Sequence, residues 1–101
     1  MLVVARLSPP DDEDAFRRDI RAAIDALASR PGHVSTRLAR ALDDPAMWVL
    51  VSEWVNVGSY RRALSSYDVK MASGVLMGAV VPEPTAYEVV ESHAAGDAEP
   101  H

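Results

Sequence analysis

The chain has 101 residues, a hydrophobic fraction of 49%, a charged fraction of 25% and a formal net charge of -5. These values are typical of one soluble globular domain with a single core, and they exclude wholesale disorder. The basic residues are scattered along the chain rather than gathered in a patch, so we expect no nucleic-acid partner.

The chain contains no cysteine, which excludes a disulfide framework, a thiolate nucleophile and a cysteine-based metal site. Its opening apolar segment is too short for the core of a signal peptide, and no apolar run approaches the roughly 20 residues that span a bilayer. We therefore expect a cytoplasmic protein without a membrane partner.

The first part of the chain predicts a strand followed by a helix. Residues 2–7 alternate with apolar side chains on both faces, as in a strand covered on both sides. Pro9 and Pro10 end it, and the acidic residues 11–14 suit the N-terminus of a helix. The apolar residues that then recur at helical spacing are Phe16, Ile20, Ala23, Ile24 and Leu27. Pro31 and Gly32 end this helix.

The middle of the chain predicts a hairpin of two strands, residues 34–42 and 47–54, joined by a turn at 43–46. In the second strand, alternation separates two sets of side chains. One face carries Trp48, Leu50, Ser52 and Trp54, and the other carries Met47, Val49, Val51 and Glu53. Both faces need cover, although Glu53 would require a partner such as Arg6 or Arg40.

The remaining segments predict helices and a last strand. Asn56 is a suitable N-cap for a helix whose apolar face holds Val57, Tyr60, Ala63, Leu64 and Tyr67. Asp68 is a suitable cap for a further helical segment that reaches Ala79. A final strand is expected over residues 86–90. Residues 92–101 are small and polar, and we expect them to be a disordered tail after a domain of residues 1–91.

The order strand, helix, strand, strand, helix, strand is that of a ferredoxin-like β-α-β-β-α-β sandwich of the α+β class. Such a fold has an antiparallel four-stranded sheet with helices on one face only. The second face of the sheet then requires cover, and a homodimer formed through this open face would supply it.

Three short motifs resemble the antibiotic biosynthesis monooxygenase (ABM) domain. They are R-P-G-H-V at residues 30–34, S-E-W at residues 52–54 and V-G-S-Y-R-R-A-L at residues 57–64. The resemblance covers about residues 1–91, and it implies a dimeric α/β barrel in which two sheets pack face to face. Some members of the family are cofactor-independent monooxygenases that oxidise an electron-rich aromatic or polyketide-like substrate with dioxygen.

The resemblance also implies a site for a small aromatic molecule and dioxygen, without metal, flavin or other cofactor. Trp54 and Tyr60 match the family's pocket residues and are the expected catalytic pair. The expected substrate-binding residues are Leu50, Ser52, Tyr67 and Met71. Leu50 stands where an asparagine is expected, and Gly74 stands near the position of an expected arginine.

Other interpretations of the same residues remain. Trp54, Tyr60 and Tyr67 could be core residues, and the chain could be a non-enzymatic dimeric module that binds a small ligand or another chain. His33 is expected at the rim of the sheet, outside the cavity. His93 and His101 lie in the tail and make a poor metal site, and a haem-degrading role lacks the asparagine and histidine that it requires.

Overall fold

The chain forms an antiparallel four-stranded sheet with all its helices on one face, as the ferredoxin-like prediction requires. A computed structural model describes residues 1–94, so the predicted tail lies outside the described residues from residue 95 onward. In chain order the elements are β1 (Leu2–Leu7), α1 (Glu13–Ala28), β2 (His33–Arg40), β3 (Trp48–Trp54), α2 (Val57–Ser65), α3 (Tyr67–Ala72), α4 (Gly74–Ala79) and β4 (Ala86–Tyr87).

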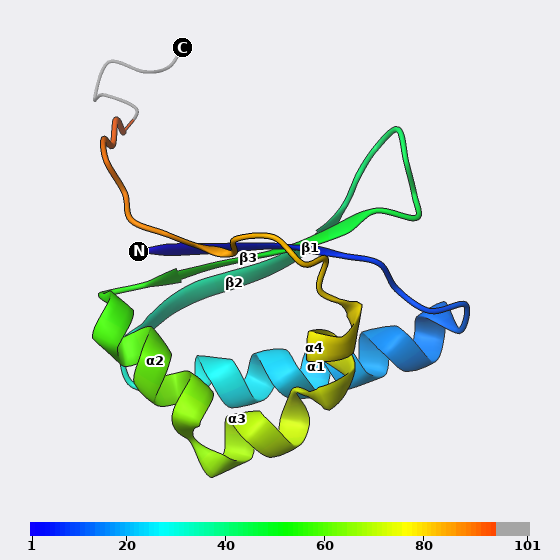
Figure 1. The fold of residues 1–101 in the computed structure, drawn as a ribbon, viewed down its shortest axis with the longest axis horizontal. Coiled ribbons are helices and arrows are strands. Elements are labelled where there is room, and N and C mark those ends of the chain that lie inside the picture. Colours follow the sequence, from blue (N-terminus) through cyan, green and yellow to red (C-terminus); the bar gives the residue numbers. More distant parts are fainter. Residues whose placement is uncertain (95–101) are drawn as a thin grey trace.

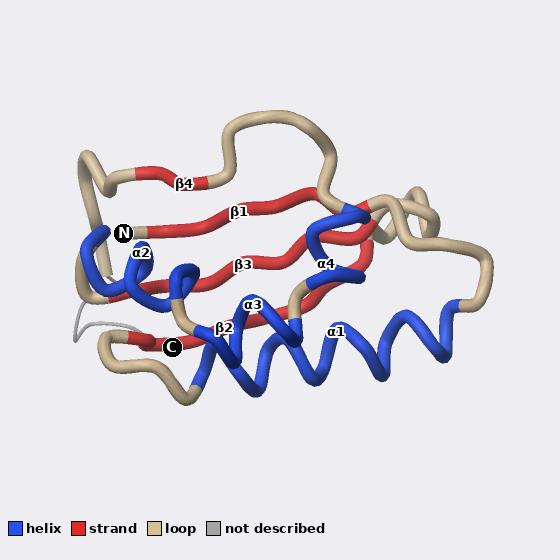
Figure 2. Tube along the Cα trace, turned by 60° about the horizontal axis from the view of Figure 1, so that its bottom comes forward, coloured by secondary structure: helices blue, strands red, loops and turns tan. Residues whose placement is uncertain are grey.

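The strands lie in the order β2-β3-β1-β4, so β3 and β1 are the central pair (Figure 2). Their register places Val3 opposite Ser52 and Leu7 opposite Trp48. Because side chains alternate along a strand, this register sends the two tryptophans of β3 to the face that the helices cover. Both tryptophans are buried, which confirms the predicted division of the strand into two faces.

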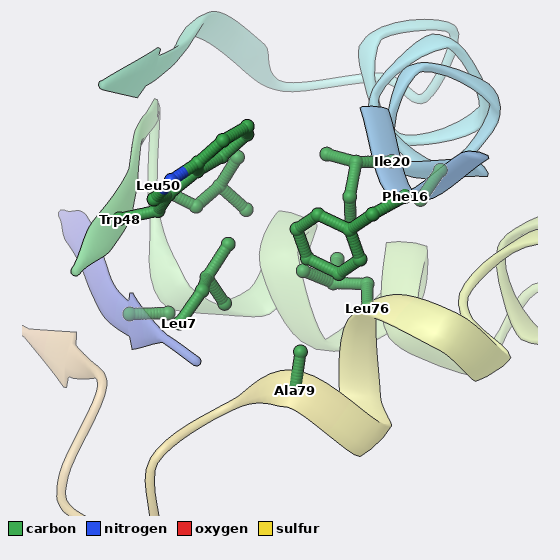
Figure 3. Packing of buried hydrophobic residues seen from close by; sticks show 9 residues of the cluster. Leu7, Phe16, Ile20, Trp48, Leu50, Leu76 and Ala79 are labelled. Carbon is green, nitrogen blue, oxygen red and sulfur yellow. The ribbon is translucent and has the colours of Figure 1, made fainter. Parts of the chain in front are cut away.

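The helices pack against this face and enclose the core (Figure 1). Helix α1 begins after Asp12, whose carboxylate accepts a hydrogen bond from the backbone N–H of Ala15 at 3.0 Å. Figure 3 shows Phe16 and Ile20 of α1 facing side chains from β1, β3 and α4. The rings of Phe16 and Trp48 meet edge to face at a centroid distance of 5.7 Å, a favoured aromatic arrangement.

The turn between α1 and β2 requires glycine. Gly32 has φ of 91°, in the left-handed region that residues with a Cβ rarely adopt. A Cβ at this position would also collide with the side chain of Ser59 on α2. The Pro31–Gly32 turn therefore brings the start of β2 close to the start of α2.

None of the helices within residues 1–94 covers the opposite face of the sheet (Figure 1). This face carries half-buried apolar side chains, among them Val4, Val49 and Val51. Arg6, on the same face, pairs through two nitrogens with the carboxylate of Glu83. The hydrogen bond from Arg6 lowers the pKa of Glu83 below its usual value. Arg40 pairs with Glu13 at 2.9 Å, so neither arginine is the predicted partner of the exposed Glu53.

Several predicted boundaries were wrong. Strand β2 ends at Arg40, and Leu42, predicted inside it, is fully exposed in the hairpin loop. Strand β4 covers only residues 86–87, because it pairs with β1 at Leu2 and Val3 alone. Ser66, not Asp68, caps α3 by accepting a hydrogen bond from the N–H of Val69 at 3.4 Å.

The first testable prediction concerns the core. Ile20 has no exposed surface, and its replacement by alanine leaves a cavity between α1 and the sheet. Ile20→Ala should lower the free energy of unfolding by about 2–5 kcal/mol in urea denaturation. Arg18→Ala, on the exposed side of the same helix, should change it by less than about 0.5 kcal/mol. Equal effects of the two variants would contradict this packing.

Candidate functional site

A mostly apolar cavity of about 80 Å³ lies between the sheet and the helices that follow β3. Val3, Leu50 and Ser52 contribute to its sheet side. Tyr60 from α2 and Ser73 and Leu76 from the α3–α4 region contribute to its helix side. Its lining, a few polar groups among apolar walls, is the usual lining of a small-molecule site.

Trp54 holds the Ser52 hydroxyl, the polar group on the sheet side of the cavity, in place. Its indole N–H donates a hydrogen bond to the Ser52 hydroxyl at 3.0 Å, in a fully buried position. Ser52 and Trp54 lie on the same face of β3 because they are two residues apart. The bond fixes the Ser52 oxygen as an acceptor toward Trp54, and the hydroxyl proton can then be donated into the cavity.

Tyr60 packs on Trp54 from the helix side. The two ring centroids are 5.6 Å apart, with the ring planes tilted by 55°. Asn56 positions this turn of helix, because its side chain accepts a hydrogen bond from the N–H of Ser59 at 2.8 Å, as expected of the predicted N-cap. Burial raises the pKa of the Tyr60 phenol above its ordinary value, so the hydroxyl keeps its proton well into alkaline conditions.

The structure brings together three of the predicted site residues and places a fourth beside them. Leu50, Ser52 and Tyr60 line the cavity, and Trp54 lies directly behind Ser52 and Tyr60. Tyr67 and Met71 are not brought to it: their side chains are 75% and 67% exposed. The reason is the break at Ser66, which starts a new helix and removes Tyr67 from the face that carries Tyr60.

His33 lies nearer to this group than predicted. Its ring meets Trp54 edge-on at a centroid distance of 5.1 Å, and its Nε2 lies 2.6 Å from the Thr36 hydroxyl. The imidazole therefore packs against the indole of Trp54. It does not belong to the residues that line the cavity.

Ser73 is a site residue that the sequence did not reveal. It is buried at the break between α3 and α4, where no side-chain hydrogen bond caps the second helix. The only signal in the sequence is a serine before a glycine inside an otherwise apolar helical segment. That pattern predicts a helix break but not which way the hydroxyl points.

A second hollow of about 240 Å³ adjoins the cavity and shares Leu64, Ser73 and Met77 with it. Lys70 and Gly74 also line it. At Gly74 an added Cβ would meet no atom within 4 Å, so this position has room for a side chain. Within residues 1–94 no group of three or more His, Asp or Glu side chains is placed to hold a metal ion. Nor is any helix of that stretch long and apolar enough to cross a membrane.

The fold and the sequence both match one family. The sequence profile described as antibiotic biosynthesis monooxygenase matches residues 1–73. The chain belongs to the ABM family. This confirms the family that the three motifs resemble, and the observed sheet confirms the ferredoxin-like fold.

Solved structures from other organisms share this fold. SnoaB, a cofactor-independent oxygenase from Streptomyces nogalater, superposes with a TM-score of 0.72 at 21% identity, over 90% of this chain and 96% of that one. Rv0793 from Mycobacterium tuberculosis gives a TM-score of 0.72 at 18% identity, over 92% and 97% of the two chains. These identities show a common fold.

A sequence relative is the "42.8 kDa protein in whiE locus" of Streptomyces coelicolor, which is 43% identical over 53 residues. The matched segment is 52% of this chain and 12% of that protein, so the chain corresponds to a small part of it.

The second prediction follows from the burial of Tyr60. In the unfolded chain the phenol ionises near its ordinary pKa of 10.0, whereas in the native protein its pKa is higher. The stability that this difference contributes is fully present below pH 10 and is lost as the pH rises through the native pKa. Wild-type protein should therefore lose stability above pH 10 more steeply than Tyr60→Phe, measured by chemical denaturation at a series of pH values.

The control for this measurement is Tyr67→Phe, which removes a phenol from an exposed position. If the Tyr60→Phe protein followed the wild-type curve throughout the alkaline range, the inferred burial of the Tyr60 hydroxyl would be wrong.

Proposed function

We propose that the protein is a cofactor-independent monooxygenase that oxidises an electron-rich hydroxy-aromatic substrate with dioxygen. The observation that carries the proposal is an apolar cavity lined by the hydroxyl-bearing side chains of Ser52 and Tyr60. The chain that forms this cavity belongs to the ABM family. SnoaB, which shares the fold, is a cofactor-independent oxygenase, and this similarity supports the same reaction type.

The reaction needs no added electron donor. The ionised substrate transfers one electron to dioxygen, the two radicals combine to form a carbon–oxygen bond, and the peroxide then eliminates water to leave a carbonyl. One oxygen atom remains in the product and the other leaves as water, whose two hydrogens are those that the substrate has lost. The substrate therefore supplies all the electrons.

The residues of the cavity suit this chemistry. Ser52 and Tyr60 can donate hydrogen bonds to the oxygen that carries the negative charge of the substrate anion. Tyr60 remains a donor because its raised pKa keeps the phenol neutral at the pH where hydroxy-aromatics ionise. The apolar walls formed by side chains such as Val3, Leu50 and Leu76 exclude water from the radical and peroxide intermediates.

Trp54 acts in this scheme as a positioning residue. It is 1% exposed and reaches the cavity through Ser52 and Tyr60, so its indole orients the two donors that meet the substrate. This is a narrower role than the catalytic one that the family resemblance implied.

The proposal extends to a homodimer through the uncovered sheet face. Val4 and Val51 lie opposite each other in the β1–β3 ladder, and Val49 lies two pairs further along, opposite Arg6. A second copy would bury these side chains and close the barrel that is implied for the family.

The alternative is a non-enzymatic dimeric module that binds a small ligand in the same cavity. Leu50 and Gly74 favour it, since both occupy positions where the family resemblance implies polar side chains. The two functions differ in whether dioxygen is consumed.

The third prediction tests the reaction. Wild-type protein should consume dioxygen with an anthrone- or dihydroxynaphthalene-like compound in the presence of a chelator, without flavin or nicotinamide. Trp54→Phe keeps an aromatic ring but removes the N–H that holds Ser52, so kcat/KM should fall by about 3- to 10-fold, the worth of one hydrogen bond. Ser52→Ala should lower it by a similar factor, and the double variant should lose little more, because both changes remove the same interaction.

The control is Trp48→Phe. Trp48 lies on the same strand face in the core, but its N–H donates to the backbone carbonyl of Pro45, and neither residue lines the cavity. A fall in kcat/KM in this variant equal to that in Trp54→Phe would show a general effect of core packing. Ligand binding without any oxygen consumption would favour the non-enzymatic module.

The fourth prediction concerns the dimer. Val51→Asp places a carboxylate in the centre of the uncovered face, where burial without a partner costs several kcal/mol. Sedimentation velocity should give twice the 10.9 kDa chain mass for wild type and a monomer or unfolded chain for the variant. Val75→Asp, the same exchange on an exposed position of α4, should remain dimeric. A stable wild-type monomer at micromolar concentration would refute the dimer.

A further inference from the structure

Ser73 carries a buried hydroxyl for which the described residues provide no partner. The residue is 7% exposed, and its Oγ has no hydrogen-bond partner within residues 1–94. It is the N-cap residue of α4, at the break between α3 and α4, but its side chain makes no capping hydrogen bond. Its side chain therefore has no evident role in holding the two helices together.

The position of Ser73 suggests what the hydroxyl is for. Ser73 lines both the 80 Å³ cavity and the adjoining 240 Å³ hollow, and Leu64 and Met77 also line both. These three side chains are thus the boundary between the two spaces. Ser73 is the polar member of the boundary, and Leu64 and Met77 are the apolar members.

A buried hydroxyl without a partner destabilises a protein, whereas alanine would fit the same space at no such cost. Unsatisfied buried groups in folded proteins are few, and they often lie where a ligand or ordered water binds. A residue that destabilises the fold is commonly retained because it serves the function of the protein.

The cavity alone is too small for an aromatic ring. An engineered cavity that binds benzene has a volume of about 150 Å³, roughly twice that of the cavity here. The adjoining hollow can supply the missing space if the boundary moves. Met77 is 61% exposed and has a flexible side chain, so it is the member of the boundary that can move most readily.

We propose that the Ser73 hydroxyl binds an oxygen substituent of an aromatic ligand. The ring of this ligand lies across the cavity and the hollow, in the space that opens when the Met77 side chain moves from between them. The ligand class, a planar hydroxy- or oxo-aromatic, rests on the proposed function. Ser52 from the sheet and Ser73 from the helices then contact the ligand from opposite walls. Lys70, at the second hollow, adds a positive charge that favours an ionised phenol.

The test uses 1-naphthol and naphthalene as a matched pair of probes, with binding followed by NMR titration of the whole protein under anaerobic conditions. Ser73→Ala should weaken the binding of 1-naphthol by about 3- to 10-fold and leave the binding of naphthalene unchanged, because only naphthol carries the oxygen. The melting temperature of Ser73→Ala should equal or exceed that of wild type. A residue that merely held α3 and α4 together would instead lower the melting temperature and affect both probes alike.

Two further pairs test where the ring lies. The methyl resonance of Met77 should shift on binding, and that of Met71, which lines neither space, should not. Gly74→Leu should obstruct the hollow and weaken the binding of both probes. Gly78→Leu is the matched control, because Gly78 also has open space around it but does not line the hollow.

The proposal is overturned if Ser73→Ala binds both probes as wild type does, if it loses stability and both affinities together, or if wild-type protein binds neither probe. It is also overturned if Met71 shifts and Met77 does not. Because the titration excludes oxygen, binding that depends on Ser73 supports this site even where the oxygen-consumption assay fails, so the two proposals are tested separately.

Discussion

The pairing of β1 with β3 is the constraint on which the rest of the structure depends. Its register puts Ser52 opposite Val3 and Trp48 opposite Leu7, so these side chains all point to the helical face. A shift of one residue would send Trp48, Leu50 and Trp54 to the uncovered face and bring Glu53 into the core, at a large cost in free energy. The fold of the helical layer and the position of the site therefore follow from this single register.

The site lies where the core is divided. One cluster of buried side chains gathers around Trp48 and Phe16, and a second gathers around Trp54 and Val69. The cavity draws Leu50 and Leu76 from the first cluster and Val3 and Tyr60 from the second. Helices α3 and α4 are each only six residues long, and the break between them prevents one continuous helix from filling this junction. The unfilled space is thus a consequence of how the short helices cross the sheet.

This arrangement separates the residues that stabilise the fold from those that serve the site. Trp48 is packed by Phe16 and by the guanidinium of Arg40, 4.9 Å from its ring centre, and contributes to the core alone. Trp54 has a similar degree of burial but donates its N–H to Ser52 beside the cavity. The cavity and the Ser73 hydroxyl, which has no hydrogen-bond partner within residues 1–94, both reduce the stability of the fold. Such a loss of stability is expected at positions where the residue type serves binding and not packing.

The sequence by itself determined the elements that depend on local pattern. Alternation over residues 48–54 predicted which side chains are buried, Asn56 predicted the start of α2, and the ABM motifs predicted the family that the profile match confirms. These features could be predicted because strand alternation, helix caps and glycine turns are properties of neighbouring residues.

What only the tertiary structure decided depends on contacts between distant segments. The break at Ser66 moved Tyr67 off the face of Tyr60, and Arg6 paired with Glu83, which lies 77 residues further along the chain, and not with Glu53. Ser73 could not be recognised as a site residue, because a hydroxyl becomes a binding group only when the surrounding elements bury it and leave it unpaired. Such burial is set by the packing of α3, α4 and the sheet together, and no local pattern of the sequence encodes it.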